Sequence, residues 1–320
     1  PPRPSYPAWP SLPHCKCSNC PLRDEEHPTC PAATSLMDVV EHFSYSLSTE
    51  VVSVTIETDA RTYVKRAPLP EAVSSLMGLL MVTSDCPVMS KLRPMVRHHL
   101  PFATLDETKY RVMSMYLLAQ FFAEQRGRTP DWELKRLPQL YEDIHTVNRE
   151  FFKRLSDMNI EDATLNAIVR LDTFADSVAF TLDETSLEEF EDLFRSYLEE
   201  GVMATVSQTG SQPVRFRYAF RFDSGEERVI DIALDQRTLE LIEPAPAGPP
   251  DERTLGFCQS PRCSRRNTEC PTCPAASRLE ELVGFFRGRR AEEPVSVSID
   301  AESRTYVKRT SLQQAITSLV

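Results

Sequence analysis

Two stretches of the chain decide its fold: VVSVTIETDARTYVKR at residues 51–66 and PVSVSIDAESRTYVKR at residues 294–309. In each stretch, branched apolar residues alternate with polar ones, an acidic turn follows, and a second run leads into Thr-Tyr-Val-Lys-Arg. A period of two is typical of strands with one buried face. The sequence therefore predicts the same pair of strands at two places in one chain.

These strands are part of a longer internal repeat. Residues 15–77 match residues 258–320 without a gap, with 28 identities in 63 positions. The offset of 243 residues is the size of a domain and far exceeds the ~20–50 residues of a solenoid repeat. We interpret the chain as tandem units. Because the second copy stops where we expect a helix, we also expect the gene product to continue.

A further strand pair lies between the two copies. Residues 214–242 again alternate, and Asp223, Ser224 and Gly225 are typical of a hairpin turn. The sequence does not decide with which copy this hairpin packs.

The predicted fold is α+β, with tandem units that each contain a cysteine-rich metal-binding loop, a small β-sheet and a helical bundle. The expected segments are a proline-rich linker (1–13), the metal-loop and sheet part of unit one (14–69), its helical bundle (70–210), the β-hairpin (211–243), a second proline-rich linker (244–257) and a truncated second copy of the metal-loop and sheet part (258–320).

Hydrophobic periodicity predicts several helices. A helix from about residue 34 to 43 would have Thr34 as its N-cap. The clearest helix, from about 106 to 126, follows Thr104 and is apolar nearly all round, as expected of a buried central helix. Further helices are expected at 131–156, 160–178 and 184–200.

Composition and charge argue against several classes of protein. Hydrophobic residues make up 41% and charged residues 26% of the 320 residues, as in globular proteins. The formal charge of −11 disfavours nucleic acid and anionic lipid as partners. The longest apolar stretch, residues 76–82, is far shorter than the ~20 residues of a membrane helix. Since no secretory signal opens the chain, we expect a cytoplasmic protein without membrane contact.

Cysteine spacing predicts metal binding. Of the nine cysteines, eight lie in two tight clusters, while Cys86 stands alone and is expected to be buried. Closely spaced thiols in a chain without a secretory signal are typical of metal sites rather than of disulfides. The expected metal ligands are Cys15, Cys17, Cys20, His27 and Cys30 in the first copy and Cys258, Cys263, Cys270 and Cys273 in the second.

The repeat indicates which metal binds and in which role. His27 aligns with Cys270, and a position that accepts either ligand is typical of Zn²⁺. An iron–sulfur cluster is the alternative, because proline follows several of these cysteines, as it does in ferredoxins. Four ligands in each copy predict a closed, structural site. Cys17 is the spare thiol because it aligns with Ser260, although it could equally replace Cys15.

Five motifs also carry a resemblance. They are Cys-x-x-Cys-Pro-Leu (17–22), His-Pro-x-Cys-Pro-Ala (27–32), Arg-Thr-Tyr-x-Lys-Arg (61–66), His-Leu-Pro-Phe-Ala (99–103) and Ser-Met-Tyr-Leu-Leu-Ala-Gln (114–120). Together they resemble an uncharacterised bacterial cysteine-rich family of unknown function. The resemblance covers roughly residues 14–200, with 214–320 as a second copy, and it implies no catalytic residue or substrate.

The sequence leaves the function unknown. Its best interpretation is a tandem-repeat interaction or scaffold protein that contains structural zinc and binds a protein partner, since repeated units raise avidity. Motifs of phosphate loops, zinc proteases and serine hydrolases are absent from the sequence, which favours a non-enzymatic role. A metal-dependent enzyme is the alternative, and an iron–sulfur redox or sensor protein is the third interpretation. The candidate partner surface consists of Arg61, Tyr63, Lys65, Arg304, Tyr306 and Lys308.

Overall fold

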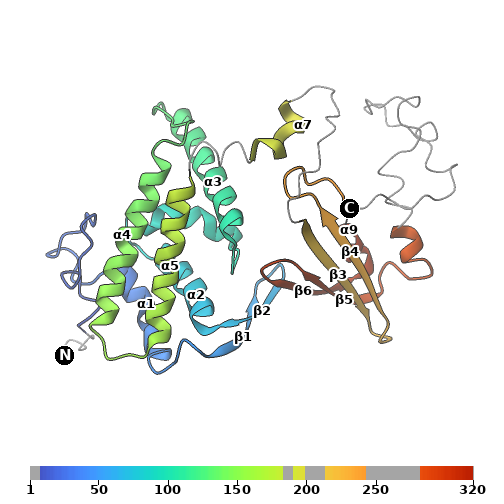
Figure 1. The fold of residues 1–320 in the computed structure, drawn as a ribbon, viewed down its shortest axis with the longest axis horizontal. Coiled ribbons are helices and arrows are strands. Elements are labelled where there is room, and N and C mark those ends of the chain that lie inside the picture. Colours follow the sequence, from blue (N-terminus) through green and yellow to red (C-terminus); the bar gives the residue numbers. More distant parts are fainter. Residues whose placement is uncertain (1–7, 183–189, 199–212, 243–281, 320) are drawn as a thin grey trace. The chain divides into compact units, whose positions relative to one another are not determined.

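The computed structural model describes residues 8–182, 190–198, 213–242 and 282–319 (Figure 1). The fold is α+β, as the sequence predicts. The chain divides into two compact units, one formed by Pro1–Ile56 with Tyr63–Glu188 and the other by Glu57–Thr62 with Glu189–Val320. None of the helices in the described ranges has both the length and the apolar character that a membrane crossing needs.

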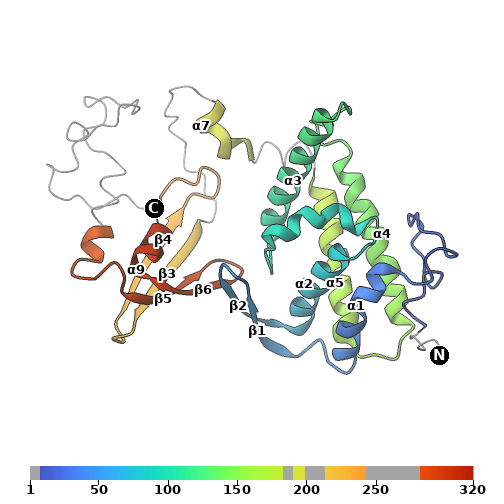
Figure 2. The same cartoon turned by 180° about the vertical axis from the view of Figure 1, so that it is seen from behind.

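The first unit is mainly helical. Figure 1 and Figure 2 show from opposite sides that α4 packs beside α5, while α2 packs against both α5 and α1. The faces that meet form a core that includes Leu36, Met77, Leu155 and Ile168. In chain order the elements are α1 (Pro31–His42), β1 (Val51–Glu57), β2 (Thr62–Pro68), α2 (Leu69–Thr83), the 3₁₀ helix η1 (Met89–His98), α3 (Leu105–Gln125), α4 (Leu137–Ser156) and α5 (Asp162–Thr181).

Local chemistry explains where two of these helices begin. α3 starts with a capping box, in which the Thr104 hydroxyl accepts from the Glu107 N–H and the Glu107 carboxylate accepts from the Thr104 N–H. α1 begins at Pro31 with Cys30 as its N-cap, so the prediction that Thr34 caps it is wrong. Proline suits the first turn of a helix because its missing N–H would have no partner there.

Helix α3 is less buried than its sequence predicts. Val112 and Met113 are buried, but Leu118, Phe121 and Phe122 are exposed by 45–55%. Within the described chain, α3 packs mainly against α5 and η1, which cover one side of it. The prediction of a buried central helix is therefore wrong, because the apolar content of a helix does not say how many neighbours it has.

The second unit contains an antiparallel sheet with the strand order β6-β5-β3-β4. Because β3 pairs with β5 as well as with β4, the hairpin of residues 211–243 packs with the second copy of the repeat, a point that the sequence leaves open. Phe220 and Phe222 of β3 are buried with Phe286, Val295 and Val297. The elements are η2 (Asp192–Phe194), α7 (Arg195–Leu198), β3 (Val214–Phe222), β4 (Glu227–Leu234), β5 (Pro294–Asp300), β6 (Thr305–Ser311) and α9 (Leu312–Thr317).

The two copies of the repeat form equivalent elements. Shifted by 243 residues, the bounds of β1 and β2 become those of β5 and β6. In both copies a helix, α2 or α9, follows the second strand without a gap. The repeat thus specifies this part of the fold, while a complete second unit with its own bundle stays a prediction. The predicted linker 244–257 lies outside the described residues.

Two other predicted segments differ in the structure. Trp9 and Leu12, which the sequence places in a proline-rich linker, are buried. Arg154 of α4 donates hydrogen bonds to the carbonyl oxygens of Trp9 and Ser11, which explains why this segment is held in place. Of the helix predicted at 184–200, the described residues form the short η2 and α7.

Candidate metal centre

Two of the predicted thiol ligands lie on one tight turn. The Cys20 N–H donates to the Cys17 carbonyl at 3.0 Å, which closes a four-residue turn. The Asn19 side-chain amide donates to the Asp143 carbonyl of α4 at 2.9 Å. This hydrogen bond holds the turn, and with it Cys17 and Cys20, against α4 of the helical unit.

Two further cysteines lie at helix ends. Cys30 is the buried N-cap of α1, and its side chain makes no capping hydrogen bond. Cys86 is buried in the segment between α2 and η1, where the backbone N–H groups of Met89 and Val88 act to lower its pKa. Both thiols are thus shielded from solvent beside the cysteine loop or within it.

These four cysteines line one small cavity. Cys17, Cys20, Cys30 and Cys86 surround about 20 Å³ of space. The other walls include Leu12, Val88, Val147 and Phe151. This volume is close to what one water molecule or one metal ion occupies. The fold therefore brings a thiol from outside the cysteine loop to the same place as three thiols of the loop.

The surroundings of the cavity affect the thiol pKa values. Burial raises the pKa of Cys17 to about 12, and the neighbouring thiols Cys30, Cys86 and Cys20 add to this effect, while the charge of Arg154 opposes it. Burial also raises the pKa of Cys86, against the lowering effect of the two N–H groups. Clustered thiols in an apolar site hold their protons unless a cation replaces them.

Arg154 is a buried cation at the wall of this cavity, which Lys16, paired with Asp24, also lines. The Arg154 side chain is 1% exposed and lines the cavity. Besides Trp9 and Ser11, its guanidinium donates to the Cys15 carbonyl at 3.3 Å. Among the described residues no carboxylate forms an ion pair with Arg154, and its Nε has no hydrogen-bond partner. A buried guanidinium with no carboxylate beside it favours negative charge in the neighbouring cavity.

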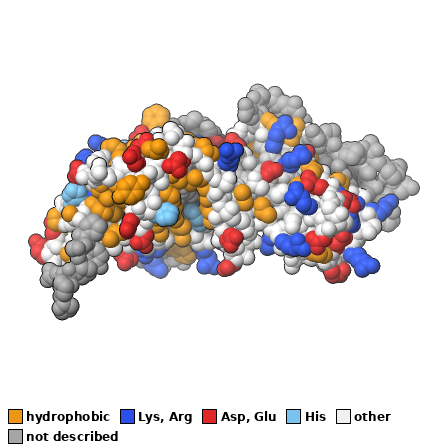
Figure 3. All heavy atoms as spheres, turned by 90° about the horizontal axis from the view of Figure 1, so that it is seen from below, with side chains coloured by type: hydrophobic (Ala, Val, Ile, Leu, Met, Phe, Trp, Pro, Cys, Tyr) orange, Lys and Arg blue, Asp and Glu red, His pale blue; other side chains and the backbone are white. Residues whose placement is uncertain are grey.

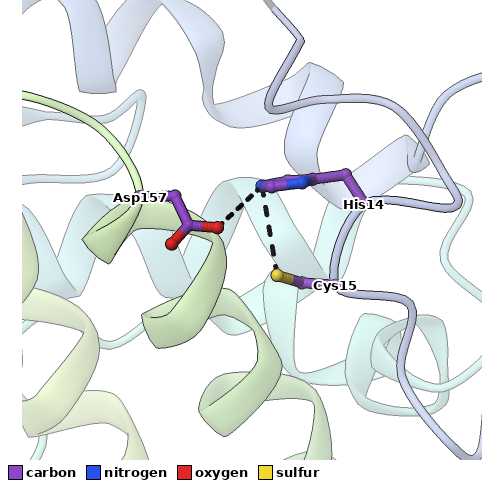
Figure 4. A group of neighbouring side chains, drawn as sticks. All are labelled: His14, Cys15 and Asp157. Atoms are coloured by element: carbon purple, nitrogen blue, oxygen red, sulfur yellow. Dashed lines mark hydrogen bonds and ion pairs between the residues drawn. The ribbon is translucent and has the colours of Figure 1, made fainter.

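Cys15, another predicted ligand, belongs to a different group. Figure 4 shows His14 Nε2 between the Cys15 sulfur, 3.9 Å away, and an Asp157 carboxylate oxygen, 3.5 Å away. Among the described residues, His14, Cys15 and Asp157 form the group whose potential ligand atoms all lie within 4.8 Å of one another. The four thiols of the cavity do not meet this limit and are spaced more widely. Both contacts use the same nitrogen, whereas a histidine that relays a proton uses both of its nitrogens.

His27 is the remaining predicted ligand that the structure describes, and it belongs to neither group. His27 is exposed, and its backbone N–H donates to the Arg23 carbonyl at 2.9 Å. The second set, Cys258, Cys263, Cys270 and Cys273, lies outside the described residues. The described cysteines Cys15, Cys17, Cys20, Cys30 and Cys86 are all free thiols. Sequence reasoning missed Cys86 as a neighbour of the cluster, because only the chain fold brings it there.

The members of the candidate partner surface lie in different surroundings, so this surface stays a prediction. Tyr63 and Arg304 are buried. The Lys65 ammonium is 2.6 Å from the Glu71 carboxylate. Arg61 and Lys308 are exposed, and Tyr306 is half-buried.

A second, larger cavity lies within the helical unit. It measures about 600 Å³, and its wall is mainly apolar side chains of α2, η1, α3 and α5. Asn148, which is 2% exposed, lines it, and its side-chain oxygen has no hydrogen-bond partner. Arg111 also lines it and is held by the Met95 and His98 carbonyls at 3.1 and 3.0 Å. Burial and the Arg111 charge together lower the pKa of His99 at this wall.

Comparison with protein families now identifies the chain. A family model described as a domain of unknown function (DUF6901) matches residues 1–195 and 216–320. The chain belongs to the DUF6901 family. No curated protein and no solved structure matches it. The second DUF6901 segment begins inside β3, in agreement with the pairing of the β3–β4 hairpin with the second copy of the repeat.

Proposed function

We propose that this DUF6901 protein is a non-enzymatic interaction or scaffold protein, located in the cytoplasm, whose cysteine loop holds a structural zinc ion. The observation that carries the proposal is the small cavity at which Cys17, Cys20 and Cys30 meet. Three of the five ligands expected in the first copy line it. Thiols suit Zn²⁺, which prefers thiolate and imidazole ligands.

The size of the cavity supports a structural ion over the alternatives. About 20 Å³ accommodates one ion but not a substrate beside it. An iron–sulfur cluster contains several iron and sulfide atoms and needs more space than one ion. The loop 14–30 contains no helix or strand, so an ion would supply the stability that a core supplies elsewhere.

Exposed apolar surface supports the interaction role. Leu118, Phe121 and Phe122 lie at i, i+3 and i+4 on α3 and are about half exposed. Figure 3 shows hydrophobic side chains gathered on one face of the helical unit as well. Contiguous exposed apolar surface of this kind is typical of protein–protein contact sites.

Elemental analysis tests the zinc. We expect two equivalents of zinc per chain if both cysteine clusters are loaded. Cys30→Ser and Cys273→Ser should each remove one equivalent and lower the unfolding temperature, because each removes a ligand. Metal content that is unchanged in both variants would refute the proposal. A visible absorption band after anaerobic purification would show that the chain binds an iron–sulfur cluster instead of zinc.

The α3 surface has its own test. Phe122→Glu should abolish the binding of a protein partner recovered by cross-linking, because a charge replaces an apolar contact. Gln125→Glu, also exposed on α3, is the matched control and should leave the partner bound. Equal recovery with both variants would place the partner elsewhere on the protein.

The 600 Å³ cavity favours a second candidate function, the binding of a small carboxylic acid with an apolar body. Its volume is in the range of small-molecule sites, and its wall is mainly apolar. Arg111 lines it, and its charge lowers the pKa of His99 at the same wall. Glu71, an acidic residue of the wall, pairs with Lys65 and Arg170. The unpaired oxygen of Asn148 offers a further polar contact.

A matched pair of probes tests this second candidate. Octanoate should raise the unfolding temperature of the wild-type chain more than octanol does, because only octanoate carries a charge for Arg111. The difference should disappear in Arg111→Gln. Equal effects of the two probes on the wild type would contradict a site for carboxylic acids.

A further inference from the structure

The cysteine loop by itself does not complete a four-ligand site. Of its five expected ligands, Cys17, Cys20 and Cys30 line the small cavity, while Cys15 lies with His14 and Asp157. His27 is exposed. Structural zinc takes four protein ligands in nearly all sites. One ligand is therefore missing from the loop, and the structure must supply it from another segment.

Cys86 is the further thiol that the fold brings to this cavity. It lines the same cavity and is buried, 56 residues after Cys30 in the chain. Its backbone N–H donates to the Ser84 hydroxyl at 3.3 Å, and its carbonyl accepts from the Ser90 N–H at 2.9 Å. These hydrogen bonds fix the backbone of Cys86 beside the cavity, as outer contacts do for metal ligands.

A second observation points to negative charge in this cavity. Arg154 is buried at its wall and has no carboxylate partner among the described residues. Four thiolates around one Zn²⁺ carry a net charge of about −2, which a buried guanidinium and the N-terminus of α1 would both stabilise. Four neutral thiols would leave the Arg154 charge without a counterion.

We propose that Cys86 is the fourth ligand of a metal ion bound by Cys17, Cys20 and Cys30, and that Cys15 and His27 are not ligands. This inference rests on the proposed zinc site and changes its ligand set. It also decides between Cys15 and Cys17, which the sequence leaves open. The ion joins the cysteine loop to the segment between α2 and η1, so it cross-links the loop to the helical unit.

Metal binding must contract the cluster. Tetrahedral zinc with Zn–S bonds of ~2.3 Å places its sulfur atoms about 3.8 Å apart. The four thiols are more widely spaced than the 4.8 Å limit that the His14 group meets. We expect the thiols to move toward the ion by changes of side-chain rotamer, and each thiol to release its proton as the ion binds.

The second copy of the repeat does not need an equivalent of Cys86. All four of its expected ligand positions are cysteine, because Cys270 stands where the first copy has His27. In exchange, Ser260 stands where the first copy has Cys17. The two copies would therefore hold their ions with different ligand sets, and variants of Cys86 should affect only one of the two ions.

Zinc content of the full chain tests the inference. Cys86→Ser should lose one equivalent of zinc, as Cys30→Ser does, while Cys15→Ser and His27→Ala should keep the wild-type content. If Cys30→Ser loses the ion but Cys86→Ser keeps it, Cys86 is not a ligand and the zinc proposal survives. If Cys30→Ser also keeps full content, the zinc proposal itself fails.

Two further measurements separate ligand loss from misfolding. Cys86→His should retain the ion, and its Co²⁺-substituted form should show the spectrum of three sulfurs and one nitrogen at this site. Alkylation followed by mass spectrometry should find Cys86 protected in the zinc-loaded chain and modified after chelation. Cys86 modified at equal rates with and without zinc would overturn the assignment.

Discussion

The strand pairs β1–β2 and β5–β6 have equivalent bounds and share Arg-Thr-Tyr-Val-Lys-Arg, yet they bury different side chains. β5 lies between β6 and β3, and Val295 and Val297 on it are buried. β1 has β2 beside it and is an edge strand among the described residues, and its Val52 and Val54 are half-buried. The repeat thus specifies the strands, while their neighbours decide which faces are covered.

The shared lysine shows the same contrast. Lys65 in β2 pairs with Glu71 of α2 at 2.6 Å and lies 5.1 Å from the centre of the Phe102 ring. The equivalent Lys308 is exposed, and Gln314 stands at the position of Glu71. One substitution in the following helix therefore removes a charged partner from an otherwise identical strand.

The largest effect should come from placing a charge on the two valines that align. Val297→Asp should destabilise the second sheet by about 4 kcal/mol or more, because the carboxylate would be buried among the core phenylalanines without a partner. Val54→Asp should cost much less, since Val54 is half-buried. Hydrogen exchange of residues 294–311 and 51–68 measures each effect locally. Equal losses of exchange protection in the two variants would show that the two strands are equally covered.

A smaller difference is expected from the two lysines. Lys65→Met should destabilise the first unit by about 1–2 kcal/mol, because it removes a partly buried ion pair and the contact of Lys65 with Phe102. Lys308→Met should change the free energy of unfolding by less than about 0.5 kcal/mol, as is usual at exposed positions. Urea unfolding measures the free energy of unfolding of both variants. An equal decrease in the two would mean that the Lys65–Glu71 ion pair adds nothing to stability.

The smallest effect should come from restoring the missing acid. Gln314→Glu should stabilise the second unit by roughly 0.5 kcal/mol, because it offers Lys308 a partner and gives α9 a capping-box glutamate after Ser311. High salt should weaken the part that comes from the ion pair. The double variant with Lys308→Met separates the two contributions, and a destabilised Gln314→Glu chain would contradict both.

The cysteines show how far sequence reasoning reaches. The spacing of Cys17 and Cys20 and the repeat of Cys30 predict a shared site, and these three cysteines line one cavity, where a tight turn holds Cys17 and Cys20. The repeat of Cys15 as Cys258 predicts that Cys15 is a ligand as well, yet in the fold Cys15 lies with His14. Spacing along the chain does not fix the direction in which a loop turns its side chains.

The helices teach a similar lesson. The start of α3 could be predicted from Thr104 and Glu107, because a capping box is a local contact. The exposure of Phe121 and Phe122 could not, because it depends on which helices pack against α3. Local rules predict where a helix begins, whereas its buried face follows from its neighbours.

The sequence alone determined the elements that depend on nearby residues: the repeated strands and the β3–β4 hairpin. Tertiary structure alone decided that β3 pairs with β5, that Arg154 is buried without a carboxylate partner among the described residues, and that Cys86 meets the cysteine loop. The physical reason is the range of the contacts involved. Turns and strand periods come from neighbours a few residues apart, but the burial of Cys86 comes from packing between segments far apart in the chain.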